Sequence, residues 1–273
     1  MNKKVLITVA PVSHFGKPVP NRCNNPLKPE EIAEEVIACA EKGAGMVHLH
    51  VRDEKGRQTS EMKEFSRTLD LITAGSDIVI QGSTGGLAEL SLEERSVCLT
   101  DPRVEVASLN MGSINFGEEV YINTLPDIRY WAKRMKETLV VPELECFDVS
   151  MVETSIQLAN EGVLERPLHF NFCFGIKGAL KADMRNLTFI SSLVETGAHW
   201  GLTHDGMVDF SFLAGAIAMG TTVLRVGFED SFYYRQGKIA EHNSILVEEI
   251  ANLVISMGGD IMTPSEYREL LGS

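Results

Sequence analysis

Two histidines one residue apart are the first residues whose types and spacing indicate chemistry. His48 and His50 lie in the segment HLHVRD, at the end of an apolar run over Met46–Arg52. Side chains two apart on a strand point to the same face, so both imidazoles should point one way and Leu49 the other. Two imidazoles and one carboxylate are a common ligand set for zinc. Hydrogen-bonded core histidines are the alternative, which is weaker for a pair at a strand end than for a single histidine.

A carboxylate for such a metal site follows another apolar run, in the segment LRVGFED. Glu229 and Asp230 come directly after this run, and Arg225 lies inside it. A solvated loop explains exposed acids in general, but an arginine within an apolar strand needs an anionic partner. Asp230 or a substrate carboxylate would provide one.

Other apolar runs also end in polar residues. Ser83 begins the segment STGG, where Gly85 and Gly86 leave backbone N–H groups exposed, an arrangement that suits an anion. Polar residues spaced two apart end two more runs, and a polar pair ends a third; these are Ser108 with Asn110, Glu143 with Glu145, and His204 with Asp205. Polar ends on several strands predict one active site at a shared edge.

The elements that must position these residues are short apolar runs that alternate with longer amphipathic segments. Eight runs of this kind predict a (β/α)₈ barrel that forms a single domain over residues 1–273. A doubly wound open sheet is the alternative; it usually has fewer strands, and no GxGxxG follows the first run. The predicted strands are Val5–Ala10, Met46–Arg52, Ile78–Ser83, Val104–Asn110, Leu139–Glu145, Leu168–Gly175, His199–His204 and Thr222–Glu229. The predicted helices are Pro29–Gly43, Glu61–Ala74, Thr124–Lys136, Ser150–Glu161, Met184–Thr196, Val208–Met219 and His242–Ser256.

Composition limits the class of protein. Lys and Arg total 25 and Asp and Glu total 38, so the net charge of −13 argues against an extended nucleic-acid interface. The five cysteines are dispersed and form no CxxC pair, which argues against a disulfide framework and favours a cytoplasmic protein. No apolar run is long enough to predict a membrane span.

The motifs taken together resemble one family along essentially the whole chain. HLHVRD, QGSTGG, SLNMGSINFG, VVPELE, LRVGFED and the tail MTPSEYRELL occur in the order typical of the β-keto acid cleavage enzymes. The resemblance implies a zinc-dependent (β/α)₈ barrel that condenses a β-keto acid with acetyl-CoA and yields acetoacetate and a new acyl-CoA. It also implies a homotetramer.

The resemblance assigns roles to residues of this chain. It implies that the zinc ligands are His48, His50 and Glu229, and that Asp230 is a catalytic base paired with Arg225. The substrate-binding residues that it implies are Ser83, Gly85, Gly86, Ser108, Asn110 and Glu143, with Glu143 facing the variable end of the keto acid. Ser108 replaces the usual threonine of the family.

The loop after the first strand departs from the family pattern. It contains His14 and Phe15 where a relative that binds an amine substrate has a glutamate, so the identity of the keto acid stays open. Two other functions remain as alternatives: a metal-dependent aldolase or amidohydrolase-like hydrolase on the same barrel, and a binding barrel with a structural metal.

Overall fold

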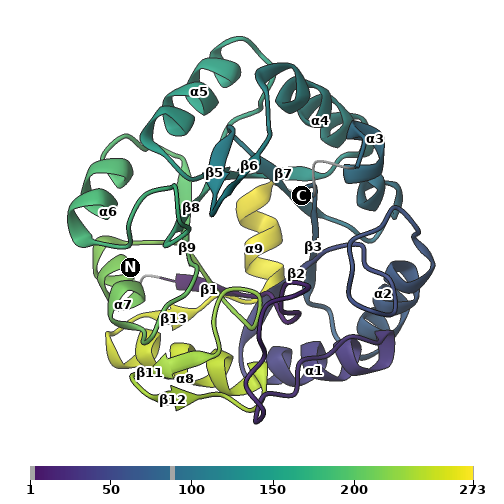
Figure 1. Cartoon of the computed structure of the whole chain (residues 1–273). Helices are drawn as coiled ribbons and strands as arrows, with labels where there is room; N and C mark the ends of the chain where they lie inside the picture. The colour runs from purple at the N-terminus through teal and green to yellow at the C-terminus, as the bar shows by residue number, and fades with distance from the viewer. Residues whose placement is uncertain (1–3, 87–89, 273) are drawn as a thin grey trace.

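Eight parallel strands form a closed barrel in the computed structural model, which describes residues 4–86 and 90–272. Closure comes from the pairing of the first and last barrel strands, in which Ile7 is in register with Leu224. Figure 1 shows the ring of helices around the strands. The barrel strands are β1 (Lys4–Val9), β2 (Ala44–Leu49), β3 (Val79–Ser83), β4 (Val106–Asn110), β7 (Val141–Cys146), β8 (His169–Phe174), β9 (His199–His204) and β10 (Val223–Val226). The barrel prediction is confirmed, and the open-sheet alternative is wrong.

The outer helices follow the amphipathic segments. They are α1 (Pro29–Glu41), α2 (Lys63–Gly75), α4 (Leu125–Thr138), α5 (Val149–Asn160), α6 (Met184–Ser191), α7 (Ser211–Met219) and α8 (Asn243–Ser256). Local sequence sets several of their first turns: Thr124 caps α4 by accepting from the Asp127 N–H, and Asp183 caps α6. Between β3 and β4, the described residues form the short α3 (Leu92–Arg95) and a 3₁₀ turn over Val97–Thr100.

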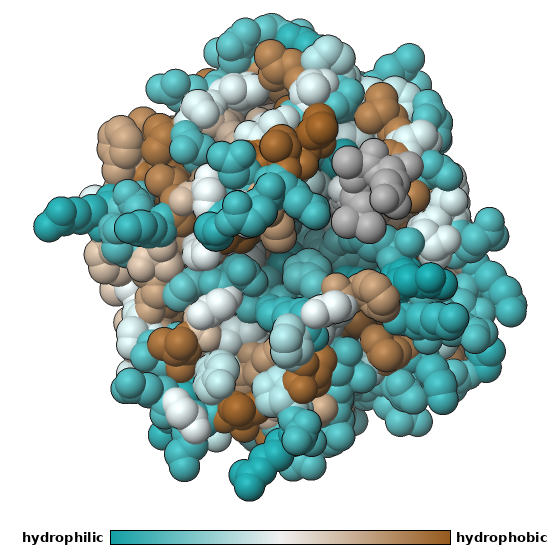
Figure 2. All heavy atoms as spheres, in the orientation of Figure 1, coloured by the Kyte–Doolittle hydropathy of each residue, from teal (hydrophilic) through white to brown (hydrophobic). Residues whose placement is uncertain are grey.

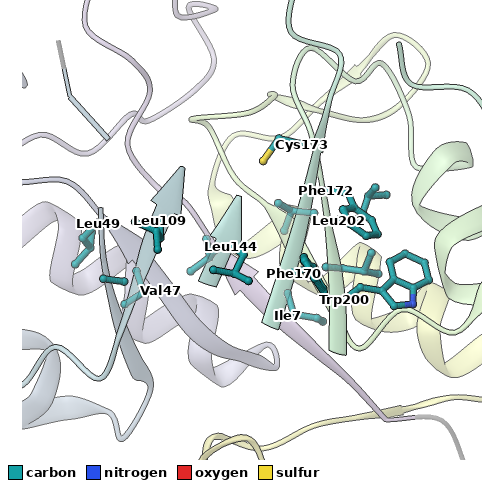
Figure 3. Packing of buried hydrophobic residues seen from close by; sticks show 14 of the residues in the cluster. Ile7, Val47, Leu49, Leu109, Leu144, Phe170, Phe172, Cys173, Trp200 and Leu202 are labelled. Atoms are coloured by element: carbon teal, nitrogen blue, oxygen red, sulfur yellow. The ribbon is translucent and has the colours of Figure 1, made fainter. Parts of the chain in front are cut away.

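Alternation along the strands separates core residues from candidate site residues. Leu49, Leu109 and Leu144 are buried against the helices with the other core residues of Figure 3. Their neighbours in sequence therefore point to the barrel interior. The predicted opposite orientations of Leu49 and the two histidines are confirmed. Strand β2 ends at Leu49, so His48 lies within the strand and His50 directly after it.

The amino-terminal end of the barrel is closed by two elements that the repeating strand–helix pattern does not predict. Strand β13 (Asp260–Ile261) pairs with β1, and helix α9 (Pro264–Leu271) follows it. Figure 1 shows α9 at the centre of the ring. Tyr267 of α9 is 1% exposed and joins a separate apolar cluster with Leu6, Met46 and Val106. Apolar side chains fill the amino-terminal end of the barrel, and the polar candidate site residues lie at the carboxyl-terminal end.

Two small hairpins extend from the loops. β5 (Ile114–Phe116) pairs with β6 (Glu119–Tyr121) between β4 and α4, and β11 (Tyr233–Arg235) pairs with β12 (Lys238–Ile239) before α8. In the described part of the chain, no helix has both the length and the apolar character needed to cross a membrane.

Candidate active site and metal centre

A cleft of about 1010 Å³, including its open mouth, lies at the carboxyl ends of the strands. In the space-filling view of Figure 2 the face is hollowed near its centre, where hydrophilic residues predominate. Most of the predicted site residues line this cleft: His48, His50, Ser83, Gly85, Gly86, Asn110, Arg225, Glu229 and Asp230. Ser108 and Glu143 are the predicted residues that lie deeper, below the lining.

Three potential metal ligands converge on one point. His48 Nε2 is 3.4 Å from His50 Nε2, and Glu229 Oε1 is 3.6 Å from the first nitrogen and 3.4 Å from the second. Ligand atoms placed tetrahedrally 2.0–2.1 Å from a common zinc ion lie about 3.3–3.4 Å apart. The three atoms therefore have the spacing that a single zinc ion requires, and they form the one three-residue group of this kind found among the described residues.

Hydrogen bonds fix the orientation of both imidazoles, and the one to His48 also sets the tautomer that a metal ligand needs. His48 Nδ1 donates to Gln81 Oε1 at 2.6 Å, which leaves the lone pair of Nε2 available to a metal. Gln58 Nε2 donates to His50 Nδ1 at 2.8 Å, which holds the second ring but leaves the proton of a neutral imidazole on Nε2. Metal binding through His50 Nε2 therefore requires the Gln58 amide to present its oxygen to Nδ1 instead. Gln81 is in register with His48 across the β2–β3 pair, so the strand pairing itself places this partner.

Burial and neighbouring charges set the protonation of the ligands. Burial and the positive charge of Arg225 hold the pKa of His48 well below its ordinary value, and burial lowers the pKa of His50 as well. Burial alone would raise the pKa of Glu229, but His50, Arg225 and His48 together hold it well below its ordinary value. Neutral imidazoles and an ionised carboxylate are the forms that bind a metal ion.

A tight turn brings Glu229 and Asp230 to the metal ligands. Gly227 has φ +144°, and a Cβ there would lie 2.1 Å from the carbonyl oxygen of Ala10. Only glycine permits this close approach of backbone to backbone. The Glu229 N–H then donates to Ala10 O at 3.2 Å, which anchors the turn to the end of β1.

Arg225 and Asp230 form the expected ion pair beside the metal ligands. Arg225 Nε donates to Asp230 Oδ2 at 2.9 Å and Nη2 donates to Oδ1 at 2.6 Å, which is a bidentate pair. Nη2 also donates to Glu229 Oε1 at 3.0 Å. Although burial opposes the charged form, these carboxylates raise the pKa of Arg225 well above its ordinary value.

The Ser83–Gly86 turn is supported from below by Ser108. The Ser83 and Ser108 hydroxyls lie 3.3 Å apart, and Thr84 Oγ1 donates to the Ser108 carbonyl at 2.6 Å. Asn110 is 1% exposed, yet neither atom of its side-chain amide has a hydrogen-bond partner in the described structure. Buried amides are normally paired, so Asn110 is positioned for a ligand. Ser108 supports the turn rather than lining the cleft.

The two glutamates of β7 occupy different depths. Glu143 accepts a hydrogen bond from Asn171 Nδ2 at 3.2 Å below the cleft, whereas Glu145 lines the cleft and lies 3.6 Å from Arg225 Nη1. Burial raises the pKa of Glu145 to about 8. The two glutamates are two residues apart and lie on one face of β7, as their spacing predicts, but Glu145 is nearer the carboxyl end of the strand. The predicted role of Glu143 at the variable end of a substrate is therefore less consistent with the structure than the same role for Glu145.

Residues outside the assigned set also lie in or beside the cleft. Lys17 Nζ donates to the carbonyl oxygens of Glu229 and Asp230 at 2.7 and 3.0 Å, so it ties the loop after β1 to the turn that carries these two acids. Tyr121 of the β5–β6 hairpin lines the cleft, as does His14, which the sequence already placed in the loop that departs from the family pattern. The strand register would have indicated Gln81, but no periodic pattern indicates Lys17 or Tyr121, because both come from irregular segments.

Comparison with known proteins agrees with this architecture. The family model described as beta-keto acid cleavage enzyme matches residues 4–272. A 3-keto-5-aminohexanoate cleavage enzyme from Acetoanaerobium sticklandii is 39% identical over 253 residues, which cover 91% of each chain. A 3-oxoadipate:acetyl-CoA acetyltransferase from Cupriavidus necator is 32% identical, with 93% of this chain and 91% of that protein covered. The solved structure of ObcA with oxaloacetate shares the fold, with a TM-score of 0.76 at 17% identity over 90% of this chain and 67% of that one. With its family model matched from the first barrel strand to the last helix, the chain belongs to the β-keto acid cleavage enzymes.

Proposed function

We propose that this chain is a zinc-dependent enzyme that condenses a β-keto acid with acetyl-CoA and yields acetoacetate and a new acyl-CoA. The observation that carries the proposal is the triangle of ligand atoms from His48, His50 and Glu229, directly beside the Arg225–Asp230 pair. The name of the 3-oxoadipate:acetyl-CoA acetyltransferase relative supports acetyl-CoA as the co-substrate.

The donor set fits zinc in its spacing and its protonation. His48, His50 and Glu229 would hold the ion and leave a position open. There the ion would act as a Lewis acid toward the keto oxygen and make the C2 proton of the substrate more acidic.

The remaining residues supply proton transfer and orientation. Asp230 takes the C2 proton, and Arg225 holds its carboxylate by two hydrogen bonds so that the acceptor oxygen has a fixed position. The Ser83 hydroxyl and the Asn110 amide hold the substrate carboxylate against the Gly85–Gly86 backbone, whose N–H groups donate to Ser83 Oγ and to Tyr121. The C2 carbanion attacks the thioester carbonyl of acetyl-CoA and displaces the CoA thiolate. The thiolate then adds to the original keto carbonyl, the C2–C3 bond breaks, and the products are the new acyl-CoA and acetoacetate, whose C2 takes back a proton.

The decisive experiment is an assay of the zinc-loaded protein with a panel of β-keto acids and acetyl-CoA. We expect equal amounts of acetoacetate and a new acyl-CoA. Consumption of a keto acid without any CoA ester would instead support the aldolase or hydrolase alternative. Turnover of no keto acid, with zinc still bound, would favour a structural metal in a binding barrel.

Variants test the assigned roles separately. His48→Ala and His50→Ala should lose zinc and turnover while the barrel stays folded, as measured by metal analysis and circular dichroism. Asp230→Asn should keep zinc but lose most turnover, because an amide does not accept the C2 proton. Asp148→Asn is the matched control, since Asp148 caps α5 and asparagine caps equally well. Exchange of the C2 proton into solvent at the wild-type rate by Asp230→Asn would exclude Asp230 as the base.

Two further properties stay predictions. We expect a homotetramer, which light scattering of the purified protein tests directly. We also expect the protein in the cytoplasm, consistent with its five free cysteines.

A further inference from the structure

The β5–β6 hairpin brings a hydroxyl to the Ser83–Gly86 turn. A Cβ placed on Gly85 would lie 2.6 Å from Tyr121 Oη, 3.1 Å from Ser83 Oγ and 3.7 Å from Asn110 Nδ2. These polar atoms come from three separate segments and surround one point of the turn. Tyr121, Ser83 and Asn110 all line the cleft, so a ligand in this corner meets all three.

The ring of Tyr121 is held in place on several sides. It contacts Phe147 edge-on, with ring centroids 6.3 Å apart, and Phe116 with centroids 6.1 Å apart. The guanidinium of Arg95 lies 5.5 Å from the ring centroid. A ring packed in this way has little freedom to rotate, so its hydroxyl stays above the turn.

Arg95 connects the turn to the hairpin. Its Nε donates to the Thr84 carbonyl at 3.1 Å, Nη1 to the Ile122 carbonyl at 3.0 Å and Nη2 to Asn123 Oδ1 at 2.5 Å. Its guanidinium also stacks 4.2 Å from the ring of Trp131. Within residues 4–86 and 90–272, the hydrogen bonds of Arg95 go to neutral acceptors, and the carboxylate of Asp127 attracts its charge from a greater distance.

We propose that Tyr121 donates a hydrogen bond to the carboxylate of the β-keto acid, and that Arg95 is a positioning residue that holds Tyr121 and the Ser83–Gly86 turn together. The inference rests on the proposed function, because it assigns the ligand of this corner as the substrate carboxylate. An anion also suits the corner electrically, since the positive charge of Arg95, which neutral acceptors hold within the described residues, lies behind it. Burial raises the pKa of Tyr121 above its ordinary value, although Arg95 and the Gly86 N–H lower it, so the hydroxyl keeps its proton.

Tyr121→Phe tests the hydroxyl with minimal change in packing. We expect the KM for the keto acid, and the Kd for acetoacetate measured by calorimetry on the zinc-loaded protein, to rise about tenfold. The KM for acetyl-CoA should not change. Tyr130→Phe is the matched control, because Tyr130 lies on the outer helix α4. A Tyr121→Phe protein that binds acetoacetate within twofold of wild type would overturn the proposal.

Arg95→Lys tests the positioning role, because lysine keeps the charge but lacks the planar fork that reaches three acceptors. We expect weaker acetoacetate binding in this variant, and less than additive loss when it is combined with Tyr121→Phe. Full additivity would show that Arg95 does not act through Tyr121. Absence of acetyl-CoA-dependent turnover in the wild type would refute the proposed function alone, since acetoacetate binding still decides the role of Tyr121.

Discussion

Replacement of Gln81 by leucine separates support of the metal from ligation of the metal. Gln81 is fully buried, and its Oε1 accepts the 2.6 Å hydrogen bond from His48 Nδ1. Leucine has similar bulk but no acceptor, so Gln81→Leu leaves all three ligands in place and removes the group that fixes the ring and tautomer of His48. It also removes the favourable contact of the Gln81 amide with Glu143.

The expected effect on zinc affinity follows from this single bond. Loss of an outer partner of a metal-bound histidine typically weakens metal affinity about 10–100-fold, or about 1.4–2.8 kcal/mol. The unpaired Nδ1–H adds a separate cost of about 1–3 kcal/mol to the stability of the metal-free protein. Competition with a zinc chelator at pH 7.5 measures the first quantity, and urea unfolding of the metal-free protein measures the second.

Gln157→Leu is the matched control, because Gln157 lies on the exposed side of α5 and its side-chain amide donates to Glu161 on the same helix surface. Its zinc affinity should equal that of the wild type. If Gln81→Leu also binds zinc within threefold of the wild type, the reasoning from the His48–Gln81 hydrogen bond is refuted. Loss of stability without loss of affinity would lead to the same conclusion.

Two further predictions concern the loop after β1 and the acid stability of the barrel. Lys17→Met should lower kcat/KM about tenfold while zinc is retained, because the two hydrogen bonds from Lys17 to the carbonyl oxygens of Glu229 and Asp230 are lost. Lys63→Met is the control, since Lys63 is exposed. Equal kinetics in the two variants would contradict a role of Lys17 in holding this turn. Burial, aided by His199, lowers the pKa of His169 to about 4, so below pH 6.5 the unfolded chain takes up a proton that the folded chain does not. The free energy of unfolding should therefore fall by about 3 kcal/mol between pH 7 and pH 4 because of His169. In urea unfolding, the free energy of His169→Gln should fall less over the same pH range by this amount.

The sequence was most informative where a regular strand leads directly into the cleft. Alternation with period two predicts that His48 and His50 share a face, and the same rule applies to Ser108 with Asn110. This alternation does not predict how deep in the barrel a side chain lies, because that depth depends on how neighbouring strands are staggered. For this reason the rule selected Glu143 together with Glu145 but did not show that only Glu145 reaches the cleft.

Short and irregular elements were not predictable in the same way. The strands of the β5–β6 hairpin have three residues each, which is too short to show a period, so Tyr121 gave no signal. The described residues between β3 and β4 form the four-residue α3 and a 3₁₀ turn, although the barrel pattern predicts a full helix there. Helix α9 was also missed, because a cap on the amino-terminal end of the barrel follows from the need to cover apolar interior residues and not from the repeating pattern.

The raised pKa of Glu145 leads to a prediction about how an acidic protein binds an anionic substrate. Below about pH 8 the Glu145 carboxyl is protonated, adds no negative charge to the cleft and is able to donate a hydrogen bond. As the pH rises through 8 it ionises, and its charge then opposes the substrate carboxylate. The KM for the keto acid should therefore rise above pH 8, whereas kcat should change less.

Glu145→Gln keeps the size and a hydrogen-bond donor but does not titrate. We expect its KM to be close to the wild-type value at pH 7 and to stay flat between pH 7 and pH 9. Glu105→Gln is the control, because Glu105 pairs with Arg268 outside the cleft. A KM for Glu145→Gln that rises with pH as steeply as that of the wild type would assign the effect to another group. A flat profile in the variant alone would show that the neutral form of Glu145, produced by its burial, is what makes this negatively charged chain receptive to a carboxylate.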